Sequence, residues 1–174
     1  MEQEHTHRRR FDLPFRWPDP PFAIVLVEPE IPQNTGNIAR LCAATGSPLH
    51  LVGPLGFQTH DRALRRAGVD YWESVEITRH VNFEQYLEEA QPPRFFLFST
   101  AGERSYFDAA YQPGDAFVFG SEGRGLPDRL LDAYPDRVLQ IPMRTDRVRS
   151  LNLANAAAIV LYEGLRQVNI GQNK

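Results

Sequence analysis

The sequence predicts a single α/β domain in which helices cover both faces of a parallel sheet. Six short apolar runs alternate with helix-like segments along its 174 residues, and this alternation is typical of parallel sheets. Several of the runs are continuously apolar, as expected of strands that are buried on both faces. A length of this order suits one domain, and the 42% of hydrophobic and 24% of charged residues are ordinary for a globular protein.

The first 21 residues are expected to form an arm outside the domain, which spans residues 22–170. Three arginines (Arg8, Arg9, Arg10) precede four prolines (Pro14, Pro18, Pro20, Pro21), and prolines at this density interrupt both helices and strand pairing. One interpretation is a flexible or loosely docked arm. The alternative is an arm that contacts RNA.

The elements of the domain follow in order from residue 22. The expected strands lie at residues 22–27, 49–52, 75–79, 95–100, 116–120 and 138–141. The expected helices lie at residues 34–45, 59–67, 83–90, 127–133 and 152–168.

Charge and composition restrict the classes of protein. The formal net charge is −3, and Lys174 is the only lysine among 19 basic residues. A binder held to nucleic acid by bulk positive charge is therefore disfavoured, and any RNA must meet local arginine clusters. No apolar run reaches the roughly 20 residues of a membrane span, and the N-terminus lacks the apolar core of a signal peptide, so a cytoplasmic protein is expected. The lone Cys42 excludes an internal disulfide and a clustered cysteine zinc site, and the five histidines show no metal-site spacing.

Polar residues and glycines are concentrated in three loops that follow strands. In the first loop, residues 28–40, Asn34 or Thr35 is expected to cap the next helix, so that backbone N–H groups face an anion. Asn37 and Arg40 share one face of this helix, while Ile38 and its neighbours face the core. A capped helix with an exposed arginine is the plain alternative.

The second loop, residues 117–127, reads FVFGSEGRGLP. Its glycines permit tight turning and close approach of the backbone to a ligand. Their spacing is not the dinucleotide fingerprint, and Glu122 suits hydroxyl groups or a positive centre better than a phosphate. A purely structural turn remains open.

The third loop, residues 141–155, carries arginines and then enters the last helix. Ser150 is expected to be the N-cap of that helix. Asn152 and Asn155 are costly residues in a helix unless their amides have partners. The alanines that follow (Ala154, Ala156, Ala157 and Ala158) would allow another helix or backbone to approach closely. Simple helix packing is the alternative explanation for them.

Two arginine clusters are candidates for RNA contact. Arg62, Arg65 and Arg66 are spaced to share one helix face, and Arg144, Arg147 and Arg149 lie in the third loop. Guanidinium groups suit bidentate contact with phosphate. Solvated surface positions are the alternative for both clusters.

Together, the three loops resemble the motifs of the SPOUT superfamily of RNA methyltransferases, in its SpoU branch of ribose 2′-O-methyltransferases. The resemblance rests on Asn34 to Arg40, on GSEGRGLP at 120–127 and on IPM…SLNLANA at 141–156. The runs VEPEIPQNTGNIARLCAATG, LRRAGVDYWE and YEGLRQ look like the small TrmL-type (YibK-type) enzymes, so the resemblance covers about residues 22–168. Two departures are Ser121-Glu122-Gly123, where TrmL-type enzymes more commonly have Pro-Glu-Thr, and an arginine-rich third loop longer by about one residue.

The resemblance implies a deep C-terminal trefoil knot, a homodimer and S-adenosylmethionine as cofactor. The implied cofactor contacts are Phe98, Gly120, Ile141, Met143 and Ser150. The implied active-site residues are Asn34, Arg40, Glu122, Ser150 and Asn152. The implied substrate is tRNA, at the wobble ribose (C or U 34) of leucine tRNAs.

The chemistry expected is in-line transfer of the sulfonium methyl group to a ribose 2′-hydroxyl, for which the site must align three atoms. Arg40 is the residue expected to matter most. A guanidinium is a poor base because its pKa exceeds about 12, so a role in stabilising the developing oxyanion is preferred to a role as base. Glu122 is expected to orient Arg40 or an N–H group at the dimer interface.

Three other functions remain open. The same fold could methylate ribosomal RNA or another tRNA position. The chain could bind nucleotide or RNA without catalysis, although five intact active-site positions argue against this. A nicotinamide oxidoreductase is disfavoured by the missing dinucleotide fingerprint.

Overall fold

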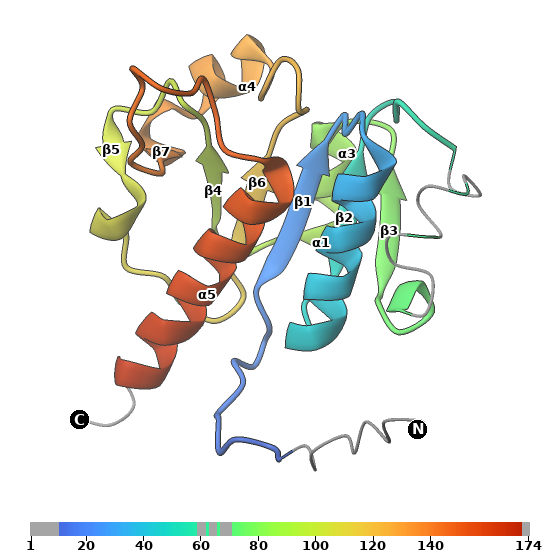
Figure 1. Cartoon of the computed structure of the whole chain (residues 1–174), viewed down its shortest axis with the longest axis vertical. Coiled ribbons are helices and arrows are strands. Elements are labelled where there is room, and N and C mark those ends of the chain that lie inside the picture. The colour runs from blue at the N-terminus through green and yellow to red at the C-terminus, as the bar shows by residue number, and fades with distance from the viewer. Residues whose placement is uncertain (1–10, 59–61, 63–65, 67–70, 172–174) are drawn as a thin grey trace, which may run out of the picture.

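The computed structural model describes residues 11–58, 62, 66 and 71–171. Within these residues, the chain forms a seven-stranded sheet in which all paired strands run parallel (Figure 1). The strands are β1 (Ala23–Val27), β2 (Leu49–Val52), β3 (Ile77–His80), β4 (Phe95–Phe98), β5 (Arg104–Ser105), β6 (Ala116–Phe119) and β7 (Val138–Gln140). The α-helices are α1 (Pro32–Thr45), α3 (Phe83–Ala90), α4 (Asp128–Ala133) and α5 (Leu153–Gly171), with 3₁₀ turns η1 (Tyr106–Asp108) and η2 (Pro135–Arg137).

The predicted parallel α/β fold is confirmed. All six expected strands are present, with ends shifted by at most two residues. The two-residue edge strand β5, which pairs only with β7, was not predicted because it has no apolar run. The helix expected at 59–67 falls mostly outside the described residues, although Arg62 and Arg66 are helical.

The strand order is β3-β2-β1-β6-β4-β7-β5. The chain starts in the middle with β1, runs outward through β2 and β3, and then crosses to β4 and β5. Both remaining strands enter between earlier ones: β6 lies between β1 and β4, and β7 between β4 and β5. The last two strands, β6 and β7, therefore each lie between strands formed earlier in the chain. The loops that follow these two strands meet at one edge of the sheet.

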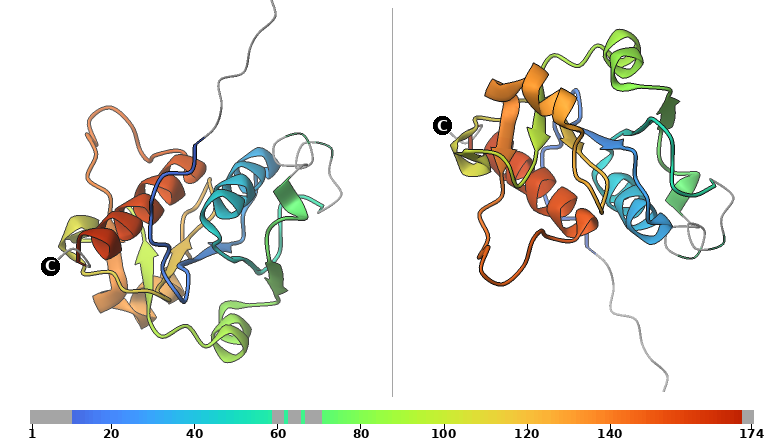
Figure 2. Two further views of the ribbon diagram at one scale, coloured as in Figure 1. Left: turned by 90° about the horizontal axis from the view of Figure 1, so that it is seen from below. Right: turned by 90° about the horizontal axis from the view of Figure 1, so that it is seen from above.

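Helices cover both faces of the sheet, as the apolar runs predict. α1 and α5 lie side by side on one face, whereas α3 and α4 lie on the other (Figure 2). Alternate residues of β1 face the two layers: Ile24 and Leu26 pack with α1 and α5, while Val25 and Val27 pack with α3 and α4. Burial on both faces explains the continuous apolar character of these strands.

No described helix is both long and apolar enough for a membrane span. Residues 11–21 contain no helix or strand and lead up into β1 between the lower ends of α5 and α1 (Figure 1).

Candidate functional site

A cavity of about 650 Å³ lies at the carboxyl ends of β4, β6 and β7. Phe98, Phe119 and Gln140, the last residues of these strands, contribute to its wall. Ligands of open parallel α/β sheets bind at this edge, and the volume lies within the range of about 300–1,000 Å³ that is usual for small-molecule sites. The three polar loops predicted from the sequence all reach this cavity.

The carboxylate of Glu122 joins the second loop to the first. It accepts hydrogen bonds from the backbone N–H of Glu30 at 2.7 Å, from that of Ile31 at 3.1 Å, and from Nδ2 of Asn34 at 3.1 Å. Backbone N–H groups near the start of α1 therefore do face an anion, but the anion is a side chain of the protein. A negative charge at this end of α1 is also favoured by the helix dipole.

The expectation that Asn34 or Thr35 caps this helix is wrong. α1 begins at Pro32, and its N-cap residue Ile31 makes no side-chain cap. Proline suits the first turn because its fixed backbone angle matches the helix and its missing N–H would have no partner there. Asn34 and Thr35 are consequently buried within the first helical turns.

Asn34 also joins the third loop. Its Oδ1 accepts a hydrogen bond from Nδ2 of Asn152 at 3.0 Å. Oδ1 of Asn152 in turn accepts from the backbone N–H of Ala154 at 2.9 Å and of Asn155 at 3.2 Å. Asn152 therefore caps α5, which explains why an asparagine stands there.

Ser150 is not the N-cap of α5, contrary to expectation. The helix begins at Leu153, so Ser150 lies too early in the chain to reach its first N–H groups. Instead, Ser150 is exposed and lines the cavity.

The glycine-rich loop is a tight turn closed by two backbone hydrogen bonds. Ser121 N–H donates to the carbonyl of Gly125 at 3.1 Å, and Gly125 N–H donates to that of Ser121 at 2.9 Å. A Cβ atom added at Gly120 would lie 2.0 Å from the carbonyl carbon of Gly125 and 2.1 Å from the nitrogen of Leu126. Only glycine fits at position 120, because the backbone closes directly on it.

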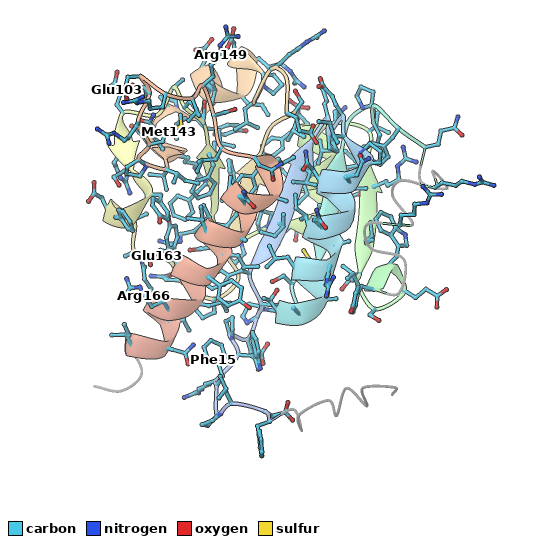
Figure 3. The ribbon with its side chains drawn as sticks, in the orientation of Figure 1. Phe15, Glu103, Met143, Arg149, Glu163 and Arg166 are labelled. Atoms are coloured by element: carbon cyan, nitrogen blue, oxygen red, sulfur yellow. The ribbon has the colours of Figure 1, made fainter. Side chains whose placement is uncertain are left out.

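Every residue assigned to the cofactor by resemblance lies at the cavity: Phe98, Gly120, Ile141, Met143 and Ser150. Asn34, Glu122 and Asn152 line it as well. Figure 3 shows Met143 and Arg149 at the upper end of the molecule, on the loop that precedes α5. The structure thus brings together residues that are up to 118 positions apart in the sequence.

Arg40 does not line the cavity. It is exposed on α1, and its guanidinium carbon lies 5.0 Å from the centre of the Tyr71 ring. Such a cation–π contact orients the side chain without burying it. Arg40 is therefore beside Tyr71, while Glu122 binds Glu30, Ile31 and Asn34.

The arginines proposed for RNA contact are divided between two places. Arg149 lines the cavity, and Arg144 and Arg147 are exposed in the turn just before it. Arg62 and Arg66 are exposed on a separate helical segment, and Arg65 lies outside the described residues.

The loop after β4 also reaches the cavity and was not identified from the sequence beyond Phe98. Ser99, Thr100 and Ala101 contribute to the wall. The strand was expected to continue to residue 100, but it ends at Phe98, and the chain turns there through a hydrogen bond from Gly102 N–H to the carbonyl of Ser99. In the sequence, the polar pair Ser-Thr directly after an apolar run could have indicated that the strand ends there and a loop begins.

Cys42 does not provide a nucleophile. The thiol is buried within the layer formed by α1 and α5, and burial raises its pKa to about 12. A thiol that remains protonated at neutral pH is a weak nucleophile.

Comparison with known proteins decides the family. Residues 21–162 match the SpoU rRNA Methylase family. The chain belongs to this family. It is 50% identical over 146 residues to the tRNA (cytidine(34)-2′-O)-methyltransferase of Escherichia coli (strain K12), an alignment that covers 83% of this chain and 92% of that enzyme.

Solved structures agree with this membership. A protein whose structure was described for the 2-OH methylation of C/U34 on tRNA is 46% identical, with a TM-score of 0.79 over 84% of this chain and 95% of that one. The SpoU methyltransferase AviRb from Streptomyces viridochromogenes, in complex with the cofactor AdoMet, is 25% identical, with a TM-score of 0.75 over 84% of this chain and 60% of that one.

The cavity is chemically suited to the cofactor of this family. Phe98, Ile141 and Met143 offer an apolar wall for a base, and they are at most half exposed. Ser150 and Asn152 offer polar groups at the same cavity for hydroxyl and amino acid groups. A small-molecule site usually combines apolar walls with convergent polar groups, and this cavity offers both kinds of surface.

Proposed function

We propose that this protein is an S-adenosylmethionine-dependent methyltransferase that modifies the ribose 2′-hydroxyl of nucleotide 34 in tRNA. One observation carries the proposal: Asn34 connects the three loops of the cavity, in a chain that is half identical to an enzyme with that activity. The loops that make up the family's motifs are thus assembled around one ligand-sized space.

The side chains at the cavity have separate roles in this proposal. Phe98, Gly120, Ile141, Met143 and Ser150 hold S-adenosylmethionine, which supplies a methyl group already activated by its sulfonium charge. Asn34, Glu122 and Asn152 keep the loops in register, so that the acceptor ribose and the methyl group are aligned. Alignment of this kind accounts for a large part of the rate enhancement when two reactants must meet in line.

Arg40 supplies positive charge to the 2′-oxygen as its proton leaves. A guanidinium is well suited to this role because it stays charged and binds both an oxyanion and the adjacent phosphate. Since Arg40 lies outside the cavity of its own protomer, the proposal requires that it reach the cavity of a second copy. We therefore infer a homodimer.

An exposed apolar stripe on α5 supports the dimer. Ile159 is 38% exposed, Tyr162 54% and Ile170 51%, and these residues are spaced to share one face of the helix. α5 adjoins α1, which carries Arg40. A dimer that covered this stripe would bring Arg40 of each protomer toward its partner.

The trefoil knot that the family resemblance implies also belongs to the proposal. The strand order supports it, because β6 and β7 both enter between strands formed earlier in the chain. The loops that follow these two strands line the cavity, so the knotted part of the chain would also form the cofactor site.

The tRNA itself would be held by exposed arginines beside the cavity (Arg144, Arg147, Arg149) and on the separate helical segment (Arg62, Arg66), together with Arg65, which lies outside the described residues. Leucine tRNAs are the proposed substrates, on the resemblance to TrmL-type enzymes. An exposed anticodon nucleotide can be splayed out into a pocket of this kind.

The decisive experiment is transfer of a labelled methyl group from S-adenosylmethionine into individual tRNA transcripts, followed by mapping of the modified ribose. We expect label at nucleotide 34 of leucine tRNAs and none in a transcript whose nucleotide 34 carries a 2′-deoxyribose. Label in ribosomal RNA or at another tRNA position would assign the other substrate of this fold. If the protein binds S-adenosylmethionine and tRNA but transfers no methyl group, it is a binding protein without catalytic activity.

A further inference from the structure

The segment of residues 11–17 precedes the part of the chain that matches the methylase family, which starts at residue 21. It reads Phe-Asp-Leu-Pro-Phe-Arg-Trp, and every second residue is apolar. Phe11 is 80% exposed, Leu13 84%, Phe15 38% and Trp17 49%. An exposed row of large apolar side chains is unusual on a globular protein and indicates an interaction site.

The segment is anchored at its end nearest the domain. Pro18 is buried, and the side-chain Nδ2 of Asn169, near the end of α5, donates a hydrogen bond to the carbonyl oxygen of Arg16 at 3.3 Å. The rings of Phe15 and Trp17 lie edge to face with centroids 4.6 Å apart. The two rings are therefore held at a defined place on the molecule and still present their surfaces to solvent.

Charge indicates what these rings contact. The ten residues 8–17 contain four arginines and one aspartate, whereas the whole chain has a net charge of −3. Positive charge is thus concentrated in the stretch of sequence that leads into and includes the rings. Aromatic rings interleaved with arginines suit unpaired nucleotides, because the rings stack on bases and the guanidinium groups bind phosphates.

The segment is far from the cavity of its own protomer. Leu153 at the start of α5 lines the cavity, while Asn169 holds the segment sixteen residues later, a distance of about 24 Å along a helix. Figure 3 shows Phe15 at the opposite end of the molecule from Met143 and Arg149. No residue of the segment lines the cavity, so the segment can affect the binding of a large substrate without taking part in methyl transfer.

We propose that residues 11–17 form a second RNA-binding element, in which Phe11, Phe15 and Trp17 stack on unpaired bases of the substrate tRNA. The proposal rests on the tRNA substrate proposed above and adds a contact outside the catalytic cavity. A second copy of the chain is the main competing partner, since alternating apolar residues also suit a protein surface. RNA is favoured because the arginines would gain nothing from an apolar protein face and complement the charge of phosphate.

The test compares the full-length protein with a triple variant, Phe11→Ala, Phe15→Ala and Trp17→Ala. Binding of a fluorescently labelled leucine tRNA transcript is measured by anisotropy with S-adenosylhomocysteine present, and methyl transfer gives kcat and KM. We expect the Kd and the KM for tRNA to rise about tenfold or more, because each stacked ring contributes substantially to affinity. We expect kcat and the Kd for S-adenosylhomocysteine to stay within twofold.

Two controls keep the test specific. The variant Phe107→Ala with Val81→Ala removes two exposed apolar side chains elsewhere and should leave the Kd for tRNA unchanged. A variant that keeps the rings, Phe15→Tyr with Trp17→Phe, should retain most of the affinity. The elution volume of each variant in size-exclusion chromatography reports whether its oligomeric state is intact.

Two outcomes would overturn the proposal. A triple variant that binds tRNA as tightly as the wild type has no stacking contact to lose. A triple variant that dissociates into smaller species, and whose loss of RNA binding matches the dissociated fraction, would assign the segment to a contact between copies. If the wild type binds tRNA but transfers no methyl group, the proposed function fails, and the anisotropy comparison still tests the segment by itself.

Discussion

The amide nitrogen of Asn152 donates a hydrogen bond to the amide oxygen of Asn34 at 3.0 Å. Because the amide nitrogen of Asn34 donates to Glu122 and the amide oxygen of Asn152 caps α5, one chain of contacts runs from the second loop through the first to the third. Neither asparagine can be replaced by an isosteric carboxylate without losing one of these bonds, because a carboxylate has no N–H to donate.

Asn34→Asp should disrupt the site more than it disrupts the fold. The new carboxylate cannot donate to Glu122 and places a like charge beside it, with a cost of about 1–3 kcal/mol for the lost partner. We expect a clear loss of cofactor affinity and of methyl transfer, measured by calorimetry and by label transfer. Asn37→Asp, on the exposed face of the same helix, is the matched control and should bind the cofactor as tightly as the wild type does.

Arg40→Ala should abolish methyl transfer and leave the cofactor bound. Loss of a group that stabilises a developing oxyanion typically lowers kcat by about 10²–10³, whereas Arg40 does not line the cofactor cavity. Arg40→Lys should retain a measurable rate if charge is what matters. A near wild-type rate in Arg40→Ala, with Arg79→Ala as surface control, would exclude Arg40 from catalysis.

Gly120→Ala should be much more harmful than Gly125→Ala. At Gly120 the added methyl group would meet the backbone of Gly125 and Leu126 within 2.1 Å, so the turn must open. At Gly125 there is space around the added atom, and only the positive φ of 72° opposes a side chain, with a cost of about 1–2 kcal/mol. Melting temperature and cofactor affinity should both fall further in Gly120→Ala, and equal effects would contradict the close packing.

Binding of tRNA should weaken steeply as salt concentration rises, because arginine contacts release counterions from phosphate. Replacing Arg144 and Arg147, both exposed beside the cavity, with glutamine should reduce the slope of log K against log salt by about 2. Anisotropy titrations between low and physiological salt measure the slope. A slope equal to that of the wild type, or an equal change in Arg79→Gln, would remove these two residues from the RNA contact.

Stability should fall between about pH 6.5 and pH 4 because of His50. Burial, and then the neighbouring His80, lowers the pKa of His50 from 6.5 to about 4. The folded protein therefore favours the neutral ring. The contribution of His50 to the free energy of unfolding is complete above pH 6.5. It decreases below that pH because the unfolded chain takes up a proton first. The whole effect is at most about 3 kcal/mol.

Urea denaturation of the wild type and of His50→Gln, at pH 7.5 and at pH 5, measures this contribution. His50 Nδ1 lies 3.0 Å from His80 Nε2, and His80 Nδ1 lies 2.8 Å from a carboxylate oxygen of Glu89. Glutamine does not titrate, so the variant should lose less stability between the two pH values. Equal losses in the two proteins would show that another group controls this part of the pH dependence.

The positions of the strands could be predicted because burial on both faces requires continuous apolar runs, as in AIVLV of β1 and AFVF of β6. β5 could not be predicted, because its pairing with β7 depends on a neighbour 35 residues away. The caps of α1 and α5 were assigned wrongly for a related reason. Several polar residues near each helix start could have served, and the choice depended on partners from distant loops.

The sequence by itself determined the fold class, the three loops and the residue types that meet at the cavity, because periodicity and motif spacing are local properties. Only the tertiary structure decided how these residues are used. It placed the carboxylate of Glu122 at the start of α1, made Asn152 the cap of α5, and left Arg40 outside the cavity. The contact of Glu122 joins segments about 90 residues apart, and the amide of Asn152 that caps α5 is also bonded to Asn34, 118 residues earlier.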